Sequence, residues 1–281
     1  MTRIDIDSVT NIIREVAAES ILPRFRRLGQ SDISFKIGDD PVTIADKEAE
    51  SSLSTRLSRL LPGSKVVGEE AFAANRGVLD ALFSESPVWI IDPVDGTRNF
   101  VKGSPEFGVI VALAEQNQTI AGWLYDPTSN EIITTEKGSG AWYKGKRLRI
   151  AAPAPLEKML GFMGDRLLEA YQKANLSTHV QPVFEIMRAG VHEYPRLVLN
   201  EPHFGKNKPQ IHFRTSYIFS TPWDDAAGVL VHQESGGYSA FWNGAPYQPS
   251  IMHEGLAVAP DKESWCALKT WCQQFVDLPS G

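Results

Sequence analysis

The sequence has few cysteines, no long apolar run and no excess of positive charge. Only Cys266 and Cys272 occur among 281 residues, which is too few for a disulfide scaffold, and we expect both in buried packing positions. The longest apolar run, residues 107–114, has about eight residues, whereas a membrane-spanning helix needs roughly 20. Residues 1–7 carry two acids and no apolar stretch, so no signal peptide is expected. These absences predict a cytoplasmic protein that does not enter the membrane.

The charge balance is mildly acidic. There are 28 Lys and Arg residues against 34 Asp and Glu, giving a formal net charge of −6. Binding along a nucleic-acid backbone requires a positive surface that displaces counterions, so nucleic acid is not an expected partner. A local acidic pocket that gathers cations is compatible with this composition.

Hydrophobic periodicity predicts a chain of mixed helices and strands. A helix is expected from Ser8, as its N-cap, to Pro23, and a second one after Asp46 that ends at Pro62. Strand-like runs then follow one another closely and predict an antiparallel meander. They cover residues 65–67, 87–91, 107–114, 119–125, 131–135 and 140–143. The run 87–91 is expected to stop at Asp92.

Beyond about residue 150 the apolar runs shorten. The segment 144–155 is the best candidate for a boundary, although it lacks the composition of a flexible linker. We therefore expect two closely packed parts. Residues 1–150 would form an N-terminal α+β half with metal-binding motifs. Residues 151–281 would form a C-terminal α/β half that carries substrate-pocket residues and part of a second metal site.

Several acids lie where elements end or begin. Glu69 and Glu70 follow one strand, Asp92 ends another, and Asp95 lies three residues further on, while Asp224 opens a helix. Such positions face the clefts where α/β proteins bind ligands. Carboxylates that converge there would repel and take up protons unless a cation neutralised them. Mg²⁺ is the commonest hard cation that fits oxygen ligands of this kind.

The segment Asp92-Pro93-Val94-Asp95-Gly96-Thr97 adds further ligand chemistry. Pro93 fixes the backbone in what we expect to be a rigid turn, and the Val94 carbonyl is a possible oxygen ligand. Gly96-Thr97 can begin a helix whose free N–H groups donate hydrogen bonds to a phosphate oxygen. Metal ligands beside an anion cradle predict metal-assisted phosphoryl hydrolysis. Taken singly, each feature has a simpler explanation: a turn at Asp95-Gly96, an N-cap at Asp224, or a solvated Glu69-Glu70 pair.

Together these motifs resemble the inositol monophosphatase family, within the lithium-sensitive, Mg²⁺-dependent phosphatases. Residues 89–100, WIIDPVDGTRNF, are similar to the first signature of the family, and residues 223–228, WDDAAG, to its second. Residues 40–46 and 68–70 match two further blocks in the same order, and the small-residue turn 234–237 follows the second signature. The resemblance covers most of residues 8 to 260.

The resemblance implies an α+β fold, a layered αβαβα sandwich, with two or three Mg²⁺ ions that Mn²⁺ can replace. By this similarity Glu69, Asp92 and the Val94 carbonyl hold the first metal, which activates water. Asp92, Asp95 and Asp224 hold the second, which stabilises the leaving alkoxide. Glu70 acts through the water network of a weaker third ion. Thr97, paired with Asp46, orients the attacking water, and the Gly96 and Thr97 amides hold the phosphate. Lys36 matches a loop residue that closes over the metals. Lithium sensitivity and a homodimer are implied as well.

The departures from the family pattern concern the substrate. Residues 188–194, RAGVHEY, replace a Gly-Ser/Thr-Ala segment, and Tyr217 stands where relatives place an acid that binds sugar hydroxyls. The segment 200–216 is longer and basic, with Lys206, Lys208 and Arg214. Without that acid, a hydroxyl group of a bound polyol would have no hydrogen-bond acceptor in the protein. Myo-inositol 1-phosphate is therefore in doubt as the substrate. His192, Tyr217 and Asp224 are the candidate substrate-binding side chains, with a helix-terminal or core position as the alternative for His192.

The sequence therefore predicts a Mg²⁺-dependent phosphomonoesterase that hydrolyses a small phosphorylated alcohol with metal-activated water. Histidinol phosphate, fructose 1,6-bisphosphate and 3′-phosphoadenosine 5′-phosphate are alternative substrates. A non-catalytic regulatory binding module is the alternative from another functional class.

Overall fold

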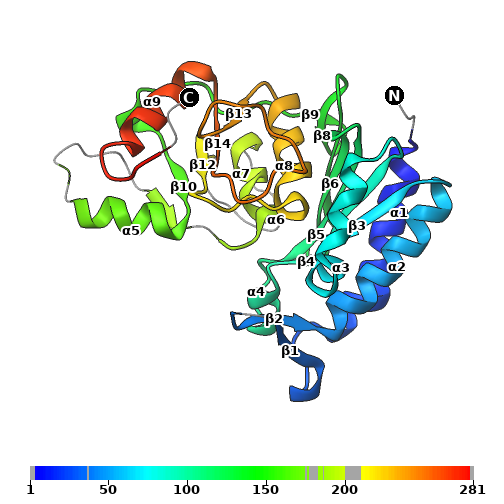
Figure 1. Ribbon diagram of the computed structural model, residues 1–281. Helices are drawn as coiled ribbons and strands as arrows, with labels where there is room; N and C mark the ends of the chain where they lie inside the picture. Colours follow the sequence, from blue (N-terminus) through cyan, green and yellow to red (C-terminus); the bar gives the residue numbers. More distant parts are fainter. Residues whose placement is uncertain are drawn as a thin grey trace.

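The computed structural model describes residues 4–36, 38–174, 176, 183–185, 187–199 and 210–278. Helices and sheets alternate in layers (Figure 1), which confirms the predicted α+β sandwich of αβαβα type. From right to left in the view, α1 and α2 come first, followed by a seven-stranded sheet, the helices α6, α7 and α8, a five-stranded sheet, and finally α5 and α9. No helix among the described residues is long and apolar enough to cross a membrane.

The outer helical layer begins one turn earlier than the sequence suggested. Helix α1 (Ile6–Val16) has Asp5 as its N-cap, whose Oδ1 accepts a hydrogen bond from the Asp7 amide (3.1 Å). Ser8, the predicted cap, lies inside the helix and donates its hydroxyl to the same Asp5 carboxylate (2.6 Å). A carboxylate placed just before the first helical turn can accept hydrogen bonds from the free backbone amides of that turn. This explains why Asp5, rather than Ser8, is the N-cap.

Helix α2 (Ile44–Leu60) begins with a capping box that buries an acid. The Thr43 side chain accepts a hydrogen bond from the Ala45 amide (3.1 Å), and the Thr43 amide donates to Asp46 Oδ2 (2.8 Å). This exchange satisfies backbone donors that the helix itself leaves free. It also fixes the Asp46 side chain, whose Oδ1 lies 3.0 Å from the Thr97 hydroxyl oxygen. A hairpin of β1 (Ile33–Lys36) and β2 (Asp40–Thr43) precedes the helix.

The seven-stranded sheet confirms the predicted antiparallel meander from β4 onward, but the prediction was wrong for β3, which pairs in parallel with β4. Its order is β3-β4-β5-β6-β7-β8-β9, with β3 parallel to β4 and all later neighbours antiparallel. Short connections such as 116–117 suffice because antiparallel neighbours need only a tight turn. The strands are β3 (Lys65–Gly68), β4 (Val88–Asp95), β5 (Gly108–Glu115), β6 (Gln118–Asp126), β7 (Glu131–Glu136), β8 (Gly140–Tyr143) and β9 (Lys146–Arg147).

Strand β4 continues through Asp95 rather than turning at Pro93, which corrects the sequence interpretation. Asp92 pairs with Ile110 and Asp95 with Gly108, so three steps along β4 face two steps along β5. In a regular strand, residues three apart point to opposite faces of the sheet. The extra residue of this β-bulge lets Asp92 and Asp95 approach the same site. Pro93, which has no N–H to donate, lies within the bulge.

The five-stranded sheet has the order β11-β10-β12-β14-β13, and α5 and α9 flank it on the far side from the first sheet (Figure 1). On α9, Cys272 is buried as expected, but Cys266 is exposed, because the two residues lie on different faces of the helix. The elements are β10 (Gly161–Met163), β11 (Val183–Glu185), β12 (Phe213–Thr215), β13 (Tyr238–Phe241), β14 (Leu256–Ala259), α5 (Asp165–Ala174) and α9 (Lys262–Cys272).

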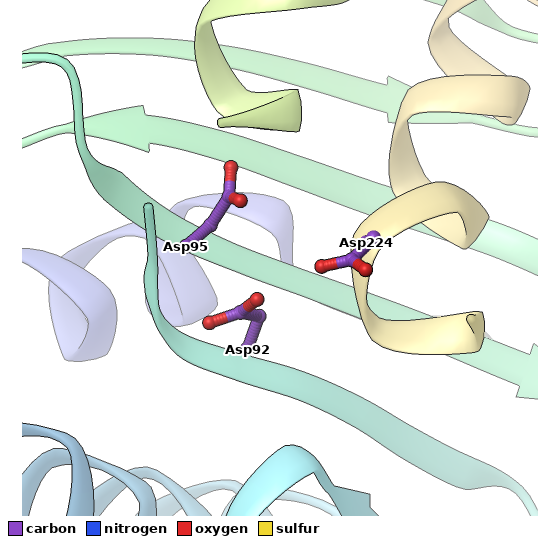
Figure 2. A group of neighbouring side chains, drawn as sticks. All are labelled: Asp92, Asp95 and Asp224. Carbon is purple, nitrogen blue, oxygen red and sulfur yellow. The ribbon is translucent and has the colours of Figure 1, made fainter. Parts of the chain in front are cut away.

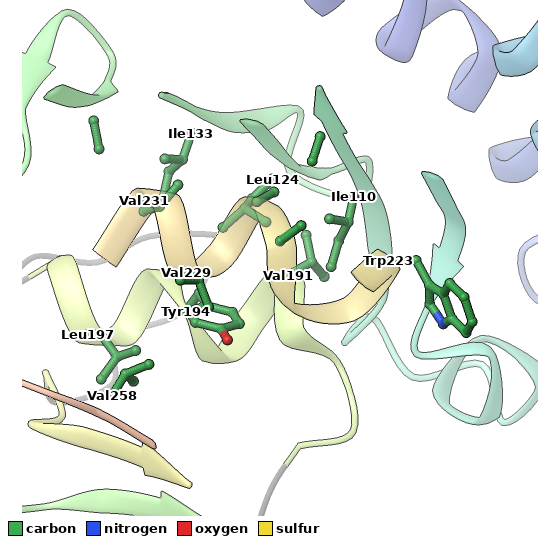
Figure 3. Close-up of a cluster of buried hydrophobic side chains, with 14 of the residues drawn as sticks. Ile110, Leu124, Ile133, Val191, Tyr194, Leu197, Trp223, Val229, Val231 and Val258 are labelled. Carbon is green, nitrogen blue, oxygen red and sulfur yellow. The ribbon is translucent and has the colours of Figure 1, made fainter. Parts of the chain in front are cut away.

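The central helices α6 (Gly190–Glu193), α7 (Pro195–Val198) and α8 (Pro222–Glu234) join the two sheets through one apolar cluster (Figure 3). Ile110, Leu124 and Ile133 enter it from the first sheet, and Val258 enters from the second. The predicted boundary at 144–155 contains β9, the last strand of the first sheet, and ends before β10, the first strand of the second sheet. The division into 1–150 and 151–281 stays a prediction.

Helix α8 approaches its neighbours closely because Gly228 has no side chain. A Cβ atom at this position would lie 2.1–2.4 Å from ring atoms of Tyr194. The Tyr194 ring cannot move easily, because it is fully buried and its hydroxyl donates to Asp225 Oδ1 (2.8 Å).

We therefore expect Gly228→Ala to lower the free energy of unfolding by about 1–3 kcal/mol, through overpacking that outweighs the gain in helix propensity. Urea denaturation measures this loss. The matched control is Gly29→Ala, where the nearest atom to the new Cβ is a carboxylate oxygen at 3.4 Å and a change within about 0.5 kcal/mol is expected. Equal losses in the two variants would contradict the packing explanation.

Candidate metal centre and its cleft

Three of the predicted acids meet where the first sheet touches α8. Asp92 and Asp95 come from the bulged end of β4, and Asp224 comes from the first turn of α8. One oxygen of each carboxylate lies within 4.8 Å of the others, and the side chains point toward one another (Figure 2). Asp224, which follows Asp92 and Asp95 by more than 120 positions in the sequence, thus forms one oxygen-lined centre with them.

Burial, reinforced by mutual repulsion, raises the pKa values of these three carboxylates. Burial raises the pKa of Asp92 well above its ordinary value, and the charges of Glu69, Asp95 and Asp224 add to the effect. Burial also raises the pKa of Asp95, although the Val191 amide donates to its Oδ2 (2.6 Å) and opposes the shift. For Asp224, burial followed by the charge of Glu69 raises the pKa to about 7. A cation placed among them would reverse these shifts.

Glu69 and Glu70 open α3 (Glu69–Ala74) at the edge of this centre. Both accept hydrogen bonds from the Lys36 ammonium, with Nζ 2.7 Å from Glu69 Oε1 and 2.6 Å from Glu70 Oε1. Burial lowers the pKa of Lys36, but the two carboxylates outweigh it and raise the pKa above its usual range. Burial raises the pKa of Glu70 to about 7 despite this bond. The pair is therefore not a solvated surface pair.

Thr97 links the acids to the buried Asp46. Its hydroxyl oxygen lies 3.0 Å from Asp46 Oδ1 and 3.0 Å from the Val94 carbonyl oxygen. Burial raises the pKa of Asp46 to about 6. Thr97 begins α4 (Thr97–Val101), and Gly96 precedes it with φ of 88°, where a Cβ would approach the Glu106 carbonyl oxygen to 2.7 Å. Only glycine fits this approach.

The acids open into a cleft of about 780 Å³. Glu70, Asp46 and His192 are not among the residues that line the cleft. The predicted site residues that do line it are Lys36, Glu69, Asp92, Val94, Asp95, Gly96, Thr97, Tyr217 and Asp224.

His192 occupies a packing position. It is 3% exposed, and its Nε2 lies 3.1 Å from the Phe107 carbonyl oxygen. This geometry gives no support to the predicted substrate contact of His192 and favours the alternative of a core position. Tyr217 does line the cleft, with its hydroxyl donating to the Asp277 carbonyl (3.3 Å).

A buried ionic network forms one wall of the cleft and was missed by the sequence interpretation. Arg214 Nε donates to Glu193 Oε2 (2.6 Å), and its Nη1 donates to Asp225 Oδ1 (2.9 Å). The guanidinium also lies over the Tyr194 ring, 4.8 Å from its centroid. Arg214 is thus a paired, structural cation rather than part of a free basic insertion. Lys206 and Lys208, the other members of that insertion, fall outside the described residues.

A layered sandwich with a carboxylate centre between the end of a β-strand and the start of a helix is typical of proteins that bind divalent cations and phosphate esters. The model of the inositol monophosphatase family matches residues 5–190. An inositol-1-monophosphatase of Mesorhizobium japonicum is 31% identical over 243 residues, 86% of each chain. A Nus factor SuhB of Vibrio cholerae is 30% identical, covering 76% of this chain and 77% of that one.

Among solved structures, a Thermotoga maritima IMPase superposes with a TM-score of 0.76 at 23% identity, over 96% of this chain and 97% of that one. The chain belongs to the inositol monophosphatase family. This membership indicates a metal-dependent phosphatase.

Proposed function

We propose that the chain is a Mg²⁺-dependent phosphomonoesterase acting on a small phosphorylated alcohol. The observation that carries the proposal is the convergence of Asp92, Asp95 and Asp224 in one cleft with Thr97 and its partner Asp46. The acids alone suit a cation site, and the adjoining Thr97 adds a hydroxyl that can orient water.

The donor set fits Mg²⁺. Every candidate ligand is a hard oxygen. Burial first, and then the charges of neighbouring carboxylates, raise the pKa values of Asp92, Asp95 and Asp224, and a cation bound among them would offset both effects. Glu69, Asp92 and the Val94 carbonyl would hold one ion, and Asp92, Asp95 and Asp224 a second. Glu70 would serve a weaker third ion, and Mn²⁺ could replace Mg²⁺. Bound there, the ions supply Lewis acidity and a water of lowered pKa.

The residues of the chain then orient water and phosphate. The Thr97 hydroxyl has one proton, and ionised Asp46 accepts it more strongly than the neutral Val94 carbonyl does. The Thr97 oxygen is left to accept a hydrogen bond from the attacking water and so to aim its lone pair at phosphorus. The Gly96 and Thr97 amides would hold the phosphate oxygens.

This role predicts a specific loss in Thr97→Val, which keeps the side-chain shape and removes the hydroxyl. We expect kcat to fall by about 10²–10⁴-fold, because positioned proton acceptors contribute in this range. Thr97→Ser, which restores the hydroxyl, should recover most of the activity. Steady-state kinetics at saturating Mg²⁺ measures both. Equal activity of Thr97→Val and the wild type would contradict the water-orienting role.

The substrate within this class is open to a direct assay. Histidinol phosphate, fructose 1,6-bisphosphate and 3′-phosphoadenosine 5′-phosphate are alternatives to an inositol phosphate. A panel of phosphorylated metabolites, assayed at fixed Mg²⁺ and again with the metal chelated, tests the proposal. We expect Mg²⁺-dependent phosphate release and inhibition by millimolar Li⁺. Insensitivity to high millimolar Li⁺ would indicate an altered second metal site.

A regulatory binding module is the second candidate, because some relatives carry the name Nus factor SuhB. The ligand set argues against it, since Glu69, Asp92, Asp95 and Asp224 are all present. Absence of turnover on every phosphate ester, with metal bound, would favour this alternative. A cytoplasmic homodimer that binds neither membrane nor nucleic acid completes the proposal. Size-exclusion chromatography with light scattering tests the dimer.

A further inference from the structure

A buried acid on α2 contacts the helix that carries Glu69 and Glu70. Glu50 is 7% exposed, and its two carboxylate oxygens accept hydrogen bonds from the backbone amides of Glu70 (2.7 Å) and Ala71 (2.8 Å). These amides belong to the first turn of α3, where a helix leaves its N–H groups without partners of its own. Glu50 therefore caps α3 from another element.

The start of α3 leaves room for this carboxylate. Gly68, the N-cap of α3, has no side chain that could accept those amides. A Cβ atom at Gly68 would lie 2.3 Å from both the carboxyl carbon and Oε2 of Glu50, so only glycine fits beside the acid. Because α3 has six residues, well below the roughly 12–15 at which an isolated helix becomes stable, its start depends on such contacts.

The capped turn carries two acids of the proposed metal centre. Glu69 and Glu70 are the first two residues of α3, so the direction of their side chains follows from where the helix begins. Strand β3 leads into α3 and pairs in parallel with β4, with Gly68 opposite Ile91. Glu69 therefore leaves its strand level with Asp92, the other side chain proposed for the first ion.

Glu50 is a supporting group rather than a ligand. Backbone amides occupy both of its oxygens, and it is not among the residues that line the cleft. Asp46 lies one helical turn earlier on the same face of α2, and its Oδ1 lies 3.0 Å from the Thr97 hydroxyl oxygen. One face of α2 thus holds both the turn with the acids and the threonine proposed to orient water.

We propose that Glu50 is a positioning residue that fixes Glu69 and Glu70 in the orientation that binds divalent metal ions. This inference rests on the proposed function, because it takes these two acids to be part of the metal centre. An ionised acceptor makes shorter and stronger hydrogen bonds than a neutral one, which suits Glu50 to hold a helix start in place. Ligands that are held in place before the ion arrives lose less freedom on binding it.

Mn²⁺ binding to the metal-free protein, followed by electron paramagnetic resonance, tests the inference without any substrate. We expect Glu50→Ala to raise the dissociation constant of at least one Mn²⁺ ion by about 10–100-fold, the range typical of groups that orient metal ligands. Glu48→Ala is the matched control, because Glu48 lies on the same helix but pairs with Arg24 (2.6 Å). Unchanged affinity in Glu50→Ala, or an equal loss in Glu48→Ala, would overturn the inference.

A second substitution separates the cap from general destabilisation. The Gly68 backbone is extended (φ −111°, ψ 156°), as in an ordinary N-cap residue. Gly68→Ser collides with Glu50 in the wild type, but in Glu50→Ala the new hydroxyl can accept the free amides itself. We expect the double variant to recover most of the Mn²⁺ affinity and the protection of amides 70 and 71 from hydrogen exchange, both lost in Glu50→Ala. Failure to recover either would overturn the positioning role.

Glu50→Gln serves where Glu50→Ala does not fold. It keeps the size of the side chain and one acceptor oxygen, so we expect a loss of Mn²⁺ affinity smaller than in Glu50→Ala but greater than in Glu48→Ala. Affinity equal to that of the wild type would overturn the inference.

The two proposals fail in different ways. If the wild type binds Mn²⁺ but hydrolyses no phosphate ester, the phosphatase function fails, and a loss of affinity in Glu50→Ala still supports the inference. If the wild type hydrolyses esters with Mg²⁺ and Glu50→Ala binds Mn²⁺ as tightly as the wild type, the inference alone fails. Absence of Mn²⁺ binding by the wild type overturns both.

Discussion

Asp95→Asn is expected to lower kcat by about a thousandfold or more, equivalent to roughly 4 kcal/mol of transition-state stabilisation. The substitution keeps the shape of the side chain and an oxygen that can accept the hydrogen bond from the Val191 amide. It removes one of the negative charges that would hold the second metal. Steady-state kinetics across a wide Mg²⁺ range separates weakened metal binding from a lost catalytic contribution.

The fold should survive Asp95→Asn. A buried carboxylate beside Asp92 and Asp224 destabilises the metal-free protein, so its removal should leave the melting temperature without metal equal to or above that of the wild type. Asp165→Asn provides the control, because Asp165 lines the same cleft but pairs with Arg188. Full activity in Asp95→Asn, or an equal loss in Asp165→Asn, would reject the proposed metal centre.

Mg²⁺ should stabilise the protein strongly above neutral pH and weakly near pH 5. The folded pKa values of Asp92, Asp95 and Asp224 lie above the unfolded values. Such groups stabilise the fold below the unfolded pKa, and that stability is lost as pH rises through the folded pKa. For Asp224 the window runs from the ordinary pKa of an aspartate, 3.8, to a folded pKa of about 7. Metal binding needs the ionised carboxylates, so the benefit of Mg²⁺ grows as pH rises through this window.

At 100 times its dissociation constant, Mg²⁺ should add about 2.7 kcal/mol, a shift of roughly 5–10 °C in Tm for a chain of this size. Scanning calorimetry from pH 5 to 8, with Mg²⁺ or a chelator at equal ionic strength, measures the difference. The buried His232, whose pKa burial lowers to about 3, destabilises the fold in acid but affects both conditions alike. A pH-independent shift would argue against binding at these acids.

The sequence predicted the order and type of most elements because their apolar periodicity is strong. Helix α2 and the strands from β5 to β8 follow patterns that depend on near neighbours alone. The bulge between Asp92 and Asp95 could not be predicted, because it depends on how β5 pairs with β4 across the sheet. From the sequence alone, Pro93 is as compatible with a turn as with a bulge in a strand.

The candidate site was predicted in part for the same reason. Asp92, Asp95 and Asp224 belong to short sequence motifs, so they could be recognised from neighbouring residues alone. The structure brings their side chains together. The network of Glu193, Arg214 and Asp225 has no such motif, since its members meet only through the packing of α6, α8 and β12. The one sequence signal for this network was Asp225, an acid that directly follows Asp224 and precedes an apolar run.

Helix α8 also bears on how the chain acquires its shape during synthesis. It covers the inner face of the first sheet and supplies Asp224, yet it is encoded about 75 residues beyond the end of that sheet. A nascent chain that has emerged only as far as β9 therefore exposes the apolar faces of β5 and β6 and lacks one acid of the centre. Because one helix arrives late, the first sheet stays partly uncovered and the acid centre incomplete until synthesis has passed Asp224.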